Sequence, residues 1–211
     1  MPRGIFITFE GGEGCGKSSH IKALAKYFDD KNIPYVLTRE PGGTRLGEKI
    51  RELLLSREDG AEMSARSEIL LFEAARAEHV EHLIKPALND GKIVICDRFA
   101  DSTTAYQGAA RMIDAQSTSL LNSFATGGLK PDLTIVLDIP VIEGLARAKS
   151  RDRGAPDRMG SQKSEFYEKV RRSFLELAKL EPERFAIVDS SGEKSETFAK
   201  ILSIIKNKFN V

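Results

Sequence analysis

The stretch Gly11-Gly12-Glu13-Gly14-Cys15-Gly16-Lys17-Ser18 fits the phosphate-binding loop pattern G-x-x-x-x-G-K-[ST] at every defined position. Residues 5–9 before it predict a short buried strand, and residues 19–29 after it predict an amphipathic helix. Glycines let the backbone curl so that its N–H groups point at phosphate oxygens, and the helix adds its positive N-terminal end. We therefore predict a nucleoside triphosphate site, in which Lys17 reaches the β- and γ-phosphates and Ser18 ligates Mg²⁺.

The composition is that of one globular domain. The chain has 211 residues, 41% apolar side chains and a formal charge of +1, which argues against a dedicated nucleic-acid binder. The two cysteines, Cys15 and Cys96, are not expected to form a disulfide, which fits a reducing cytosol. His79 and His82 form no zinc pattern and are expected at the surface. Because no signal peptide or membrane span is recognisable, we expect a cytoplasmic protein without membrane contact.

Strand and helix signals alternate along the chain, which predicts an α/β fold with a parallel sheet and right-handed crossovers. We expect a three-layer fold of the P-loop NTP hydrolase type, with five parallel strands flanked by helices in a single domain of residues 1–211. The four further strands are expected at residues 35–38, 92–96, 133–137 and 185–188. Helices are expected at residues 44–55, 64–89, 141–149, 165–180 and 193–208, and in two stretches that begin at residues 101 and 115.

Polar residues follow directly after four of the predicted strands. They are Glu10, Arg39-Glu40, Asp97-Arg98 and Asp189-Ser190. Because the carboxyl ends of parallel strands meet at one edge of an open sheet, we expect these residues to converge on the phosphate loop. Asp97 is predicted to hold Mg²⁺ or its waters opposite Ser18. Asp138 also ends an apolar strand, but Ile139-Pro140 follow it and a structural role is favoured.

Arg39 and Arg98 end two strands that we expect to be neighbours and to face the loop. Two guanidinium groups at this place can hold a second phosphate bidentately. The alternative is a pair of surface ion pairs with Glu40 and Asp97. The first interpretation predicts a protein that transfers phosphate onto a phosphorylated acceptor, beyond binding a triphosphate.

Two further features suit such an acceptor. Phe72 and Arg76 are i and i+4 on a predicted helix, so an aromatic face lies beside a guanidinium, which suits a stacked base with a carbonyl group. Each residue alone is more often a core or a solvated residue. The arginine-rich stretch 147–158 overlaps a predicted mobile lid at about residues 149–161 that supplies arginine to the developing charge, although such runs are usually solvated surface.

The chain carries four distinctive runs of residues: Phe9-Glu10-Gly11 with the phosphate loop, residues 39–44, Asp97-Arg98-Phe99 and residues 102–108. In their order and spacing these runs resemble the thymidylate kinase family across almost the whole chain. The Arg-Glu-Pro-Gly-Gly-Thr and Ala-Tyr-Gln-Gly sequences are specific to that family among nucleoside monophosphate kinases. Because the phosphate loop carries Cys15 and no arginine while the lid is rich in arginine, the pattern looks like the bacterial subtype, whose lid supplies the catalytic arginine.

The resemblance implies an enzyme that phosphorylates dTMP to dTDP with ATP and Mg²⁺ by in-line transfer, for dTTP biosynthesis, and that forms a homodimer. It also implies a set of dTMP-binding residues. Glu10 would contact the sugar 3′-hydroxyl, Arg39 and Arg98 would hold the acceptor phosphate, and Phe72 would stack on thymine. Arg76 and Thr103 would bond the edge of the base, Tyr106 would crowd the 2′ position, and Gln107 would close the base pocket.

For the donor, the resemblance implies that ATP binds the loop from Gly11 to Ser19, with Arg147 near adenine. Arg153 would be the leading lid arginine, with Arg151 and Arg158 close by. The expected catalytic residues are Lys17, Asp97, Arg98 and Arg153. The alternatives are a kinase for another nucleoside monophosphate or small metabolite, and a nucleotide-dependent binding module.

Overall fold

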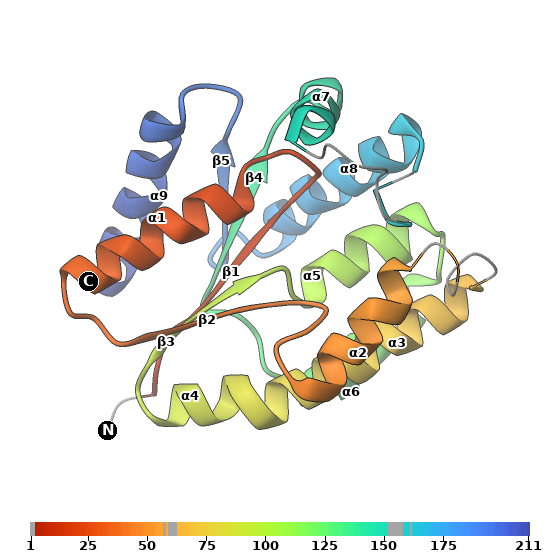
Figure 1. Ribbon diagram of the computed structural model, residues 1–211, viewed down its shortest axis with the longest axis horizontal. Coiled ribbons are helices and arrows are strands. Elements are labelled where there is room, and N and C mark those ends of the chain that lie inside the picture. The colour runs from red at the N-terminus through yellow and green to blue at the C-terminus, as the bar shows by residue number, and fades with distance from the viewer. Residues whose placement is uncertain (1–2, 57, 59–62, 152–157, 161) are drawn as a thin grey trace.

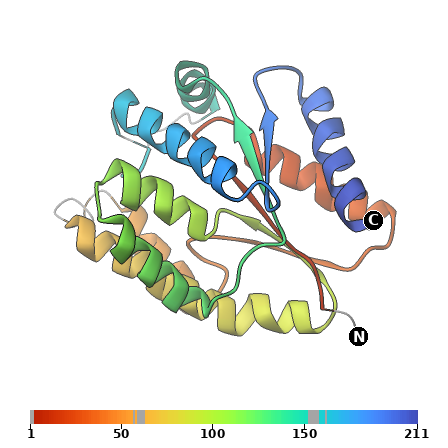
Figure 2. The same cartoon turned by 180° about the vertical axis from the view of Figure 1, so that it is seen from behind.

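A five-stranded parallel sheet forms the centre of the protein, with helices on both faces (Figures 1 and 2). The computed structural model describes residues 3–56, 58, 63–151, 158–160 and 162–211. The strands are β1 (Phe6–Gly11), β2 (Tyr35–Arg39), β3 (Ile93–Asp97), β4 (Leu133–Asp138) and β5 (Phe185–Asp189), in the order β2-β3-β1-β4-β5. The α/β class, the five parallel strands and the approximate bounds predicted from the sequence are confirmed.

The central strand β1 leads directly into the phosphate loop. It pairs with β3 on one side and β4 on the other, and every one of its residues is buried. The apolar run of β1 suits a strand covered on both faces. Its one hydroxyl, on Thr8, is satisfied because it lies 2.9 Å from the Thr134 hydroxyl. The loop therefore starts from the most enclosed part of the sheet.

One face of the sheet is covered by α1 (Lys17–Asp30) and α9 (Lys194–Phe209) (Figure 1). Leu24 and Phe28 of α1 pack with Ile201 and Ile205 of α9 over the apolar side chains of β1, β3 and β4. These residues recur at helical spacing, so each helix presents one apolar stripe to the sheet. This packing fixes the helix whose N-terminus follows the phosphate loop.

The other face is covered by helices from several parts of the chain. The cluster around Phe6 and Phe99 involves η1 (Val80–Ile84) and α4 (Lys85–Asn89), and the cluster around Phe174 involves η2 (Thr104–Ala110) and α8 (Ser164–Leu180). The remaining helices are α2 (Arg45–Leu55), α3 (Ala65–His79), α5 (Ala100–Thr103), α6 (Ala115–Thr126) and α7 (Val141–Arg151). Of these, α3 packs against both α2 and α6 (Figure 1).

The long helix predicted for residues 64–89 is one continuous rod with a π-helical turn, η1, between α3 and α4. Its predicted start is confirmed, because the Ser64 hydroxyl accepts a hydrogen bond of 3.1 Å from the Ser67 N–H. Thr44 caps α2 in the same way, through the Gly47 N–H at 3.0 Å. Both caps satisfy backbone donors that the first turn of a helix leaves free.

The expected lid, about residues 149–161, falls partly on residues 152–157 and 161, which lie outside the described part of the chain. Within the described part, no helix has the length and apolar character needed to cross a membrane. Cys15 and Cys96 are free thiols, as expected, and both are buried.

Candidate active site

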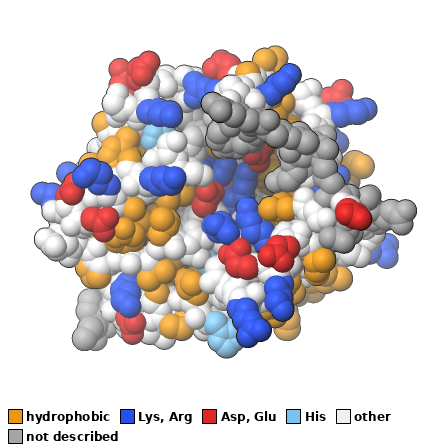
Figure 3. Space-filling view, in the orientation of Figure 1, with side chains coloured by type: hydrophobic (Ala, Val, Ile, Leu, Met, Phe, Trp, Pro, Cys, Tyr) orange, Lys and Arg blue, Asp and Glu red, His pale blue; other side chains and the backbone are white. Residues whose placement is uncertain are grey.

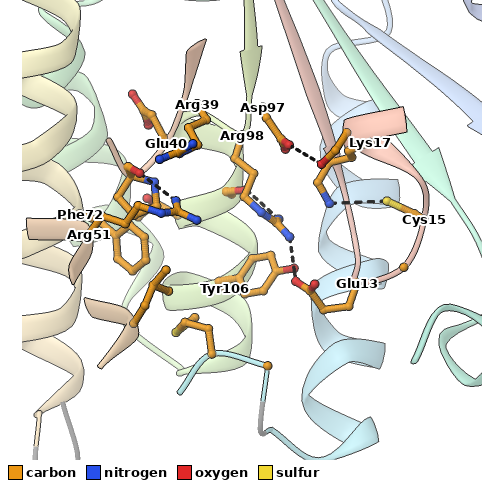
Figure 4. Close-up of a pocket in the computed structure, with 18 of the residues that line it drawn as sticks. Glu13, Cys15, Lys17, Arg39, Glu40, Arg51, Phe72, Asp97, Arg98 and Tyr106 are labelled. Carbon is orange, nitrogen blue, oxygen red and sulfur yellow. Dashed lines mark hydrogen bonds and ion pairs between the residues drawn. The ribbon is translucent and has the colours of Figure 1, made fainter. Parts of the chain in front are cut away.

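A cavity of about 470 Å³ opens at the carboxyl end of the sheet (Figure 3). Most of the predicted site residues line it: Glu13, Gly14, Cys15, Gly16, Lys17, Ser18, Ser19, Arg39, Phe72, Asp97, Arg98, Thr103, Tyr106 and Gln107. Figure 4 shows Lys17 and Cys15 on one side of it, Phe72 and Arg51 on the other, and Arg98 between them. The cavity therefore joins the phosphate loop to the side chains predicted to hold an acceptor.

The phosphate loop is held in shape by its own backbone. Gly14 and Gly16 have φ angles of 67° and 91°, in the left-handed region that favours glycine. A Cβ atom at Gly14 would lie 1.9 Å from the carbonyl oxygen of Gly144 on α7, so only glycine allows this contact. Gly16 precedes α1, and no side chain caps the helix, so its first N–H groups remain available to an anion.

Lys17 lies along this loop and points into the cavity (Figure 4). Its Nζ donates to the carbonyl oxygens of Gly11 at 3.2 Å and Gly12 at 3.1 Å, and it lies 3.6 Å from the Cys15 sulfur. The ammonium group is thus placed by the backbone that would surround the phosphates. In the absence of nucleotide the carbonyl oxygens hold the Lys17 ammonium group, and phosphate oxygens would replace them as its partners.

Ser18 and Asp97 supply an oxygen pair suited to Mg²⁺. The Ser18 hydroxyl donates to Asp97 Oδ2 at 3.3 Å, and both residues line the cavity. Mg²⁺ bound with nucleotides commonly uses one or two protein oxygens and takes its other ligands from phosphates and water. The alternative carboxylate, Asp138, is held by Arg171 through two hydrogen bonds of 2.7 and 2.9 Å. The donor set at Ser18 and Asp97 therefore fits the ion.

Arg98 connects the two sides of the cavity. Its φ angle of 72° is uncommon for a residue other than glycine and turns the side chain toward the loop. Nη2 donates to Glu13 Oε1 at 2.9 Å, and the guanidinium lies 4.8 Å from the centre of the Tyr106 ring. Burial acts to lower the pKa of Arg98, but Tyr106 and the nearby carboxylates outweigh burial and raise that pKa. The group therefore stays positively charged.

Arg39 also lines the cavity, opposite Asp97 in the register of β2 and β3. Its Nη2 donates to Glu48 Oε2 at 2.9 Å, and about half of its side chain is exposed. The alternative interpretation from the sequence paired Arg39 and Arg98 with Glu40 and Asp97. These pairs are not the ones observed. Arg39 pairs with a residue of α2, and Arg98 pairs with Glu13.

Arg76 is buried behind the cavity wall, with 1% of its surface exposed. It donates to Glu40 Oε2 at 2.9 Å, to Glu73 Oε1 at 2.6 Å and to the Thr103 hydroxyl at 3.0 Å. These acceptors satisfy Nε and Nη1, and no described residue accepts a hydrogen bond from Nη2. Phe72, one helical turn earlier, does line the cavity, so the helix face predicted from the sequence is the one turned toward it.

The histidine expectation is wrong for His79. This residue is fully enclosed, and its ring bridges Glu40 Oε1 at 2.9 Å and the Thr38 hydroxyl at 2.7 Å. His82 is exposed, as expected. The sequence carries no signal that His79 is buried, because its partners are distant in the chain: Thr38 lies in β2 and Glu40 directly follows it.

Thr103, Tyr106 and Gln107 face the cavity from the junction of α5 and η2. A π-helical turn is rare and often marks a functional site, because it shifts the side chains that follow it around the helix. Burial raises the pKa of Tyr106 well above its ordinary value, so its hydroxyl stays protonated. That hydroxyl lies 3.4 Å from Glu13 Oε1.

Five predicted residues do not line this cavity: Glu10, Gly11, Gly12, Arg76 and Arg147. Glu10 is fully buried at the end of β1, and its partner Ser102 lines the cavity instead. Arg147 donates to the backbone oxygens of Ser190 and Ser191, in the loop after β5. Asp189, the last residue of β5, and Ser190 do not line the cavity, so the expected convergence on it is wrong for this pair. Arg153 lies outside the described residues. The roles predicted for these residues stay predictions.

Glu40, which was expected to converge on the phosphate loop, does line the cavity. Other residues of the wall were not assigned to the site from the sequence, although Met159 and Gly160 fall in the expected lid: Lys22, Pro41, Arg51, Leu55, Ser102, Met159 and Gly160. Arg51 donates to the Pro41 oxygen at 2.9 Å. Pro41 and Ser102 lie within the sequence runs already singled out, so position beside a motif could have identified them. Arg51, Met159 and Gly160 reach the cavity only through packing of α2 and of the segment before α8.

Comparison with known proteins gives a consistent result. The sequence profile of the thymidylate kinase family matches residues 9–201. A thymidylate kinase of Protochlamydia amoebophila is 45% identical over 213 residues, covering 99% of this chain and 95% of the relative. One from Desulfovibrio desulfuricans is 47% identical over 207 residues, covering 96% and 95%. The crystal structure of thymidylate kinase from Ehrlichia chaffeensis has a TM-score of 0.78 at 35% identity, covering 97% of this chain and 100% of that one.

Proposed function

The chain belongs to the thymidylate kinase family, and from that premise we propose that it transfers the γ-phosphoryl group of ATP to the phosphate of dTMP, giving dTDP. One observation carries the assignment of the site. A single cavity holds the phosphate loop with Lys17 on one side, and Arg39, Arg98 and Phe72 on the other. Two phosphorylated substrates can therefore meet in one enclosed space.

On the donor side, ATP would bind the loop from Gly11 to Ser19, with its β- and γ-phosphates at Lys17 and the first N–H groups of α1. Ser18 and Asp97 would hold Mg²⁺, which when bound neutralises charge on the β- and γ-phosphate oxygens. Arg147 would lie beside adenine. Arg153 would supply positive charge to the transferred group, a role that rests on the sequence alone.

On the acceptor side, Arg39 and Arg98 would hold the phosphate of dTMP. Phe72 would stack on the thymine ring, and the free Nη2 of Arg76, with Thr103, would meet the polar edge of the base. Tyr106 would stand against the sugar and disfavour a 2′-hydroxyl, and Gln107 would close the pocket around the base. Together these residues would select a thymine deoxynucleotide by stacking, by hydrogen bonding and by shape.

The chemistry requires alignment and charge stabilisation. A phosphate monoester has a second pKa near 6, so the acceptor is largely a dianion at pH 7 and needs no general base. This agrees with His79 being enclosed away from the cavity. Lys17 and the arginines would hold donor and acceptor in line and stabilise charge that develops on the transferred group.

A coupled ADP-release assay tests the function, with ATP and Mg²⁺ as co-substrates and dTMP, dUMP, dCMP, GMP and AMP as acceptors. We expect dTMP to give the highest kcat/KM. An enzyme that uses dCMP, GMP or AMP as well as dTMP would contradict the base-pocket assignment and indicate another monophosphate kinase. ATP binding without transfer to any acceptor would indicate a nucleotide-dependent binding module.

We also propose that the chain forms a homodimer in the cytoplasm. The proposal is supported by the adjacent helices α3 and α6, which carry exposed apolar side chains that a dimer interface would cover: Leu70 (54%), Leu120 (70%) and Phe124 (86%). The two free thiols agree with a reducing compartment. Light scattering of the purified chain tests the dimer, and a monomeric mass across the micromolar range would contradict it.

A further inference from the structure

Glu68, on α3, is a buried carboxylate with donors on both of its oxygens. Only 1% of it is exposed. Oε1 accepts from Gln107 Nε2 at 2.8 Å, and Oε2 accepts from Arg158 Nη1 at 2.6 Å. Arg111 donates to both oxygens at 3.4 Å. Glu68 was not singled out in the sequence, and it lies at i, i+4 and i+8 with Phe72 and Arg76, on the helix face turned toward the cavity.

The carboxylate is firmly ionised. Burial raises the pKa of Glu68, but hydrogen bonds from Gln107 and Arg158 and the charge of Arg111 outweigh burial, and the pKa is lowered. Arg158 is itself fixed, because its Nε donates to the Leu54 oxygen at 2.9 Å. Arg111 stacks on Phe166 at 5.1 Å. The acceptor is therefore held by donors from two segments: η2 with the residue that follows it, and the turn before α8.

An ionised carboxylate only accepts hydrogen bonds, and this fixes the side-chain amide of Gln107. The NH₂ group must face Glu68, so the carbonyl oxygen, Oε1, must point the other way. Gln107 lines the cavity, and no described residue donates to its Oε1. The wall of the acceptor pocket thus presents a hydrogen-bond acceptor whose direction is set by a residue that does not line the pocket.

We propose that Glu68 is a positioning residue for base selection: by orienting Gln107, it makes the pocket accept a ring N–H and reject a ring nitrogen that is itself an acceptor. Thymine and uracil carry N–H at ring position 3, whereas cytosine carries an unprotonated nitrogen there. This inference rests on the proposed function and adds a residue to it. A pocket that holds a fixed acceptor discriminates strongly, because the wrong base leaves buried polar atoms unpaired.

The Glu68→Gln variant tests the orientation without changing volume. Arg158, which donates the short hydrogen bond of 2.6 Å, requires an oxygen at the Oε2 position, so the new amide turns its NH₂ toward Gln107 and loses only the long contact from Arg111 Nε. Gln107 must then flip and present its own NH₂ to the cavity. We expect kcat/KM for dTMP and dUMP to fall about 10-fold to 100-fold, whereas kcat/KM for dCMP stays level or rises.

Two further variants separate orientation from packing. Glu68→Asp keeps a group that only accepts, so the ratio of dTMP to dCMP activity should survive even if overall activity falls. The double variant Glu68→Gln with Gln107→Glu exchanges the two groups and again points an acceptor into the cavity, so it should recover the ratio. If Glu68 acted only through packing, the isosteric Glu68→Gln variant would keep the most activity, and Glu68→Asp would lose more.

Glu78→Gln on the same helix is the matched control, because Glu78 lies away from the cavity with one long contact to His82. Thermal melting of every variant reports folding, and the Asp and exchange variants carry the test if Glu68→Gln does not fold. Equal losses on dTMP, dUMP and dCMP in Glu68→Gln would overturn the inference. Wild-type protein inactive on dTMP would instead overturn the proposed function, so the two failures are distinguishable.

Discussion

The two sides of the cavity are built in different ways. The donor side is a backbone structure from one continuous segment, Gly11 to Ser19, in which even the Lys17 ammonium is held by carbonyl oxygens of its own loop. The acceptor side is built from side chains that come together from distant parts of the chain. Its ion pairs join residues 36 positions apart (Glu40 and Arg76) and 90 apart (Glu68 and Arg158), and Arg98 pairs across the cavity with Glu13 of the loop, 85 positions away.

This difference predicts different consequences of mutation. A loop made of backbone tolerates loss of the cation it carries, because no buried partner is left without its charge. In the acceptor side the buried charged groups are partners of one another, so removing one leaves its neighbour uncompensated. Changes in the donor side should therefore reduce catalysis with little effect on stability, and changes in the buried network of the acceptor side should reduce both.

The largest expected effect is that of Lys17→Ala. Loss of the charge beside the β- and γ-phosphates should lower kcat about 10³-fold, because this group acts on charge that grows in the transition state. The melting temperature and the affinity for dTMP without ATP should stay near the wild-type values. Steady-state kinetics, thermal melting and calorimetric titration with dTMP measure the three quantities. A large loss of stability would show that the donor side is not independent of its cation.

Arg76→Met reverses this pattern and should destabilise the fold. The variant leaves Glu40 and Glu73 buried without their cation, and Glu73 Oε2 already has no hydrogen-bond partner among the described residues. Breaking a buried pair in this way costs about 3 kcal/mol of unfolding free energy. Denaturant unfolding measures it.

Arg39→Met removes an arginine from the same side of the cavity, but one that belongs to an exposed ion pair and not to the buried network of Arg76. Arg39 and Glu48 are about half exposed, so their pair contributes less than about 1 kcal/mol. Its loss should raise the KM for dTMP and leave unfolding almost unchanged. Equal destabilisation by the two arginine variants would contradict the distinction between a buried network and an exposed pair.

The same contrast explains which parts the sequence could predict. The phosphate loop, the strand before it and the helix after it are local features, so the glycines, Lys17 and Ser18 were placed correctly. The helix face with Phe72 and Arg76 was also predictable from i, i+4 spacing. The partners of Arg76, Arg98 and Arg39 were not, because an ion pair between distant segments has no spacing in the sequence. The burial of His79 was missed for the same reason, because its partners lie in a distant segment of the chain.

Glu68 shows what a closer look at periodicity can add. It stands one turn before Phe72 on the same face, which marks it as directed inward, and a carboxylate directed inward requires a partner. The sequence does not say that the partners are Gln107 and Arg158. The fold could be predicted nearly completely, and the acceptor side only by the residues that line it.

A pH-dependent effect is expected at Glu10, which joins the two sides. Its carboxyl accepts hydrogen bonds from the Phe99 N–H at 2.7 Å and the Ser102 hydroxyl at 2.6 Å, and so ties the end of β1 to the segment after β3. Burial, with the nearby charge of Asp101, raises the pKa of Glu10 from 4.5 to about 8. Between these values the folded protein holds a proton that the unfolded chain has lost.

Because the folded state binds the extra proton, this carboxyl makes the unfolding free energy fall as pH rises from about 4.5 to about 8, and its contribution is level above that. The slope is at most about 1.4 kcal/mol per pH unit. Glu10→Gln carries a neutral group at every pH, so the wild-type minus variant difference should decline between pH 5 and pH 8. Chemical denaturation at fixed pH values measures it.

Glu181→Gln provides the matched control for this titration. The hydrogen bond from Arg184 lowers the pKa of Glu181 to about 2, so this carboxyl stays ionised in both states above pH 5. Its wild-type minus variant difference should therefore be constant between pH 5 and pH 8. A difference for Glu10→Gln that is equally constant would mean that Glu10 is ionised in the folded protein. The Glu10 carboxylate would then connect the two sides as a charged group, stabilised by its two hydrogen bonds and by the charge of Arg98.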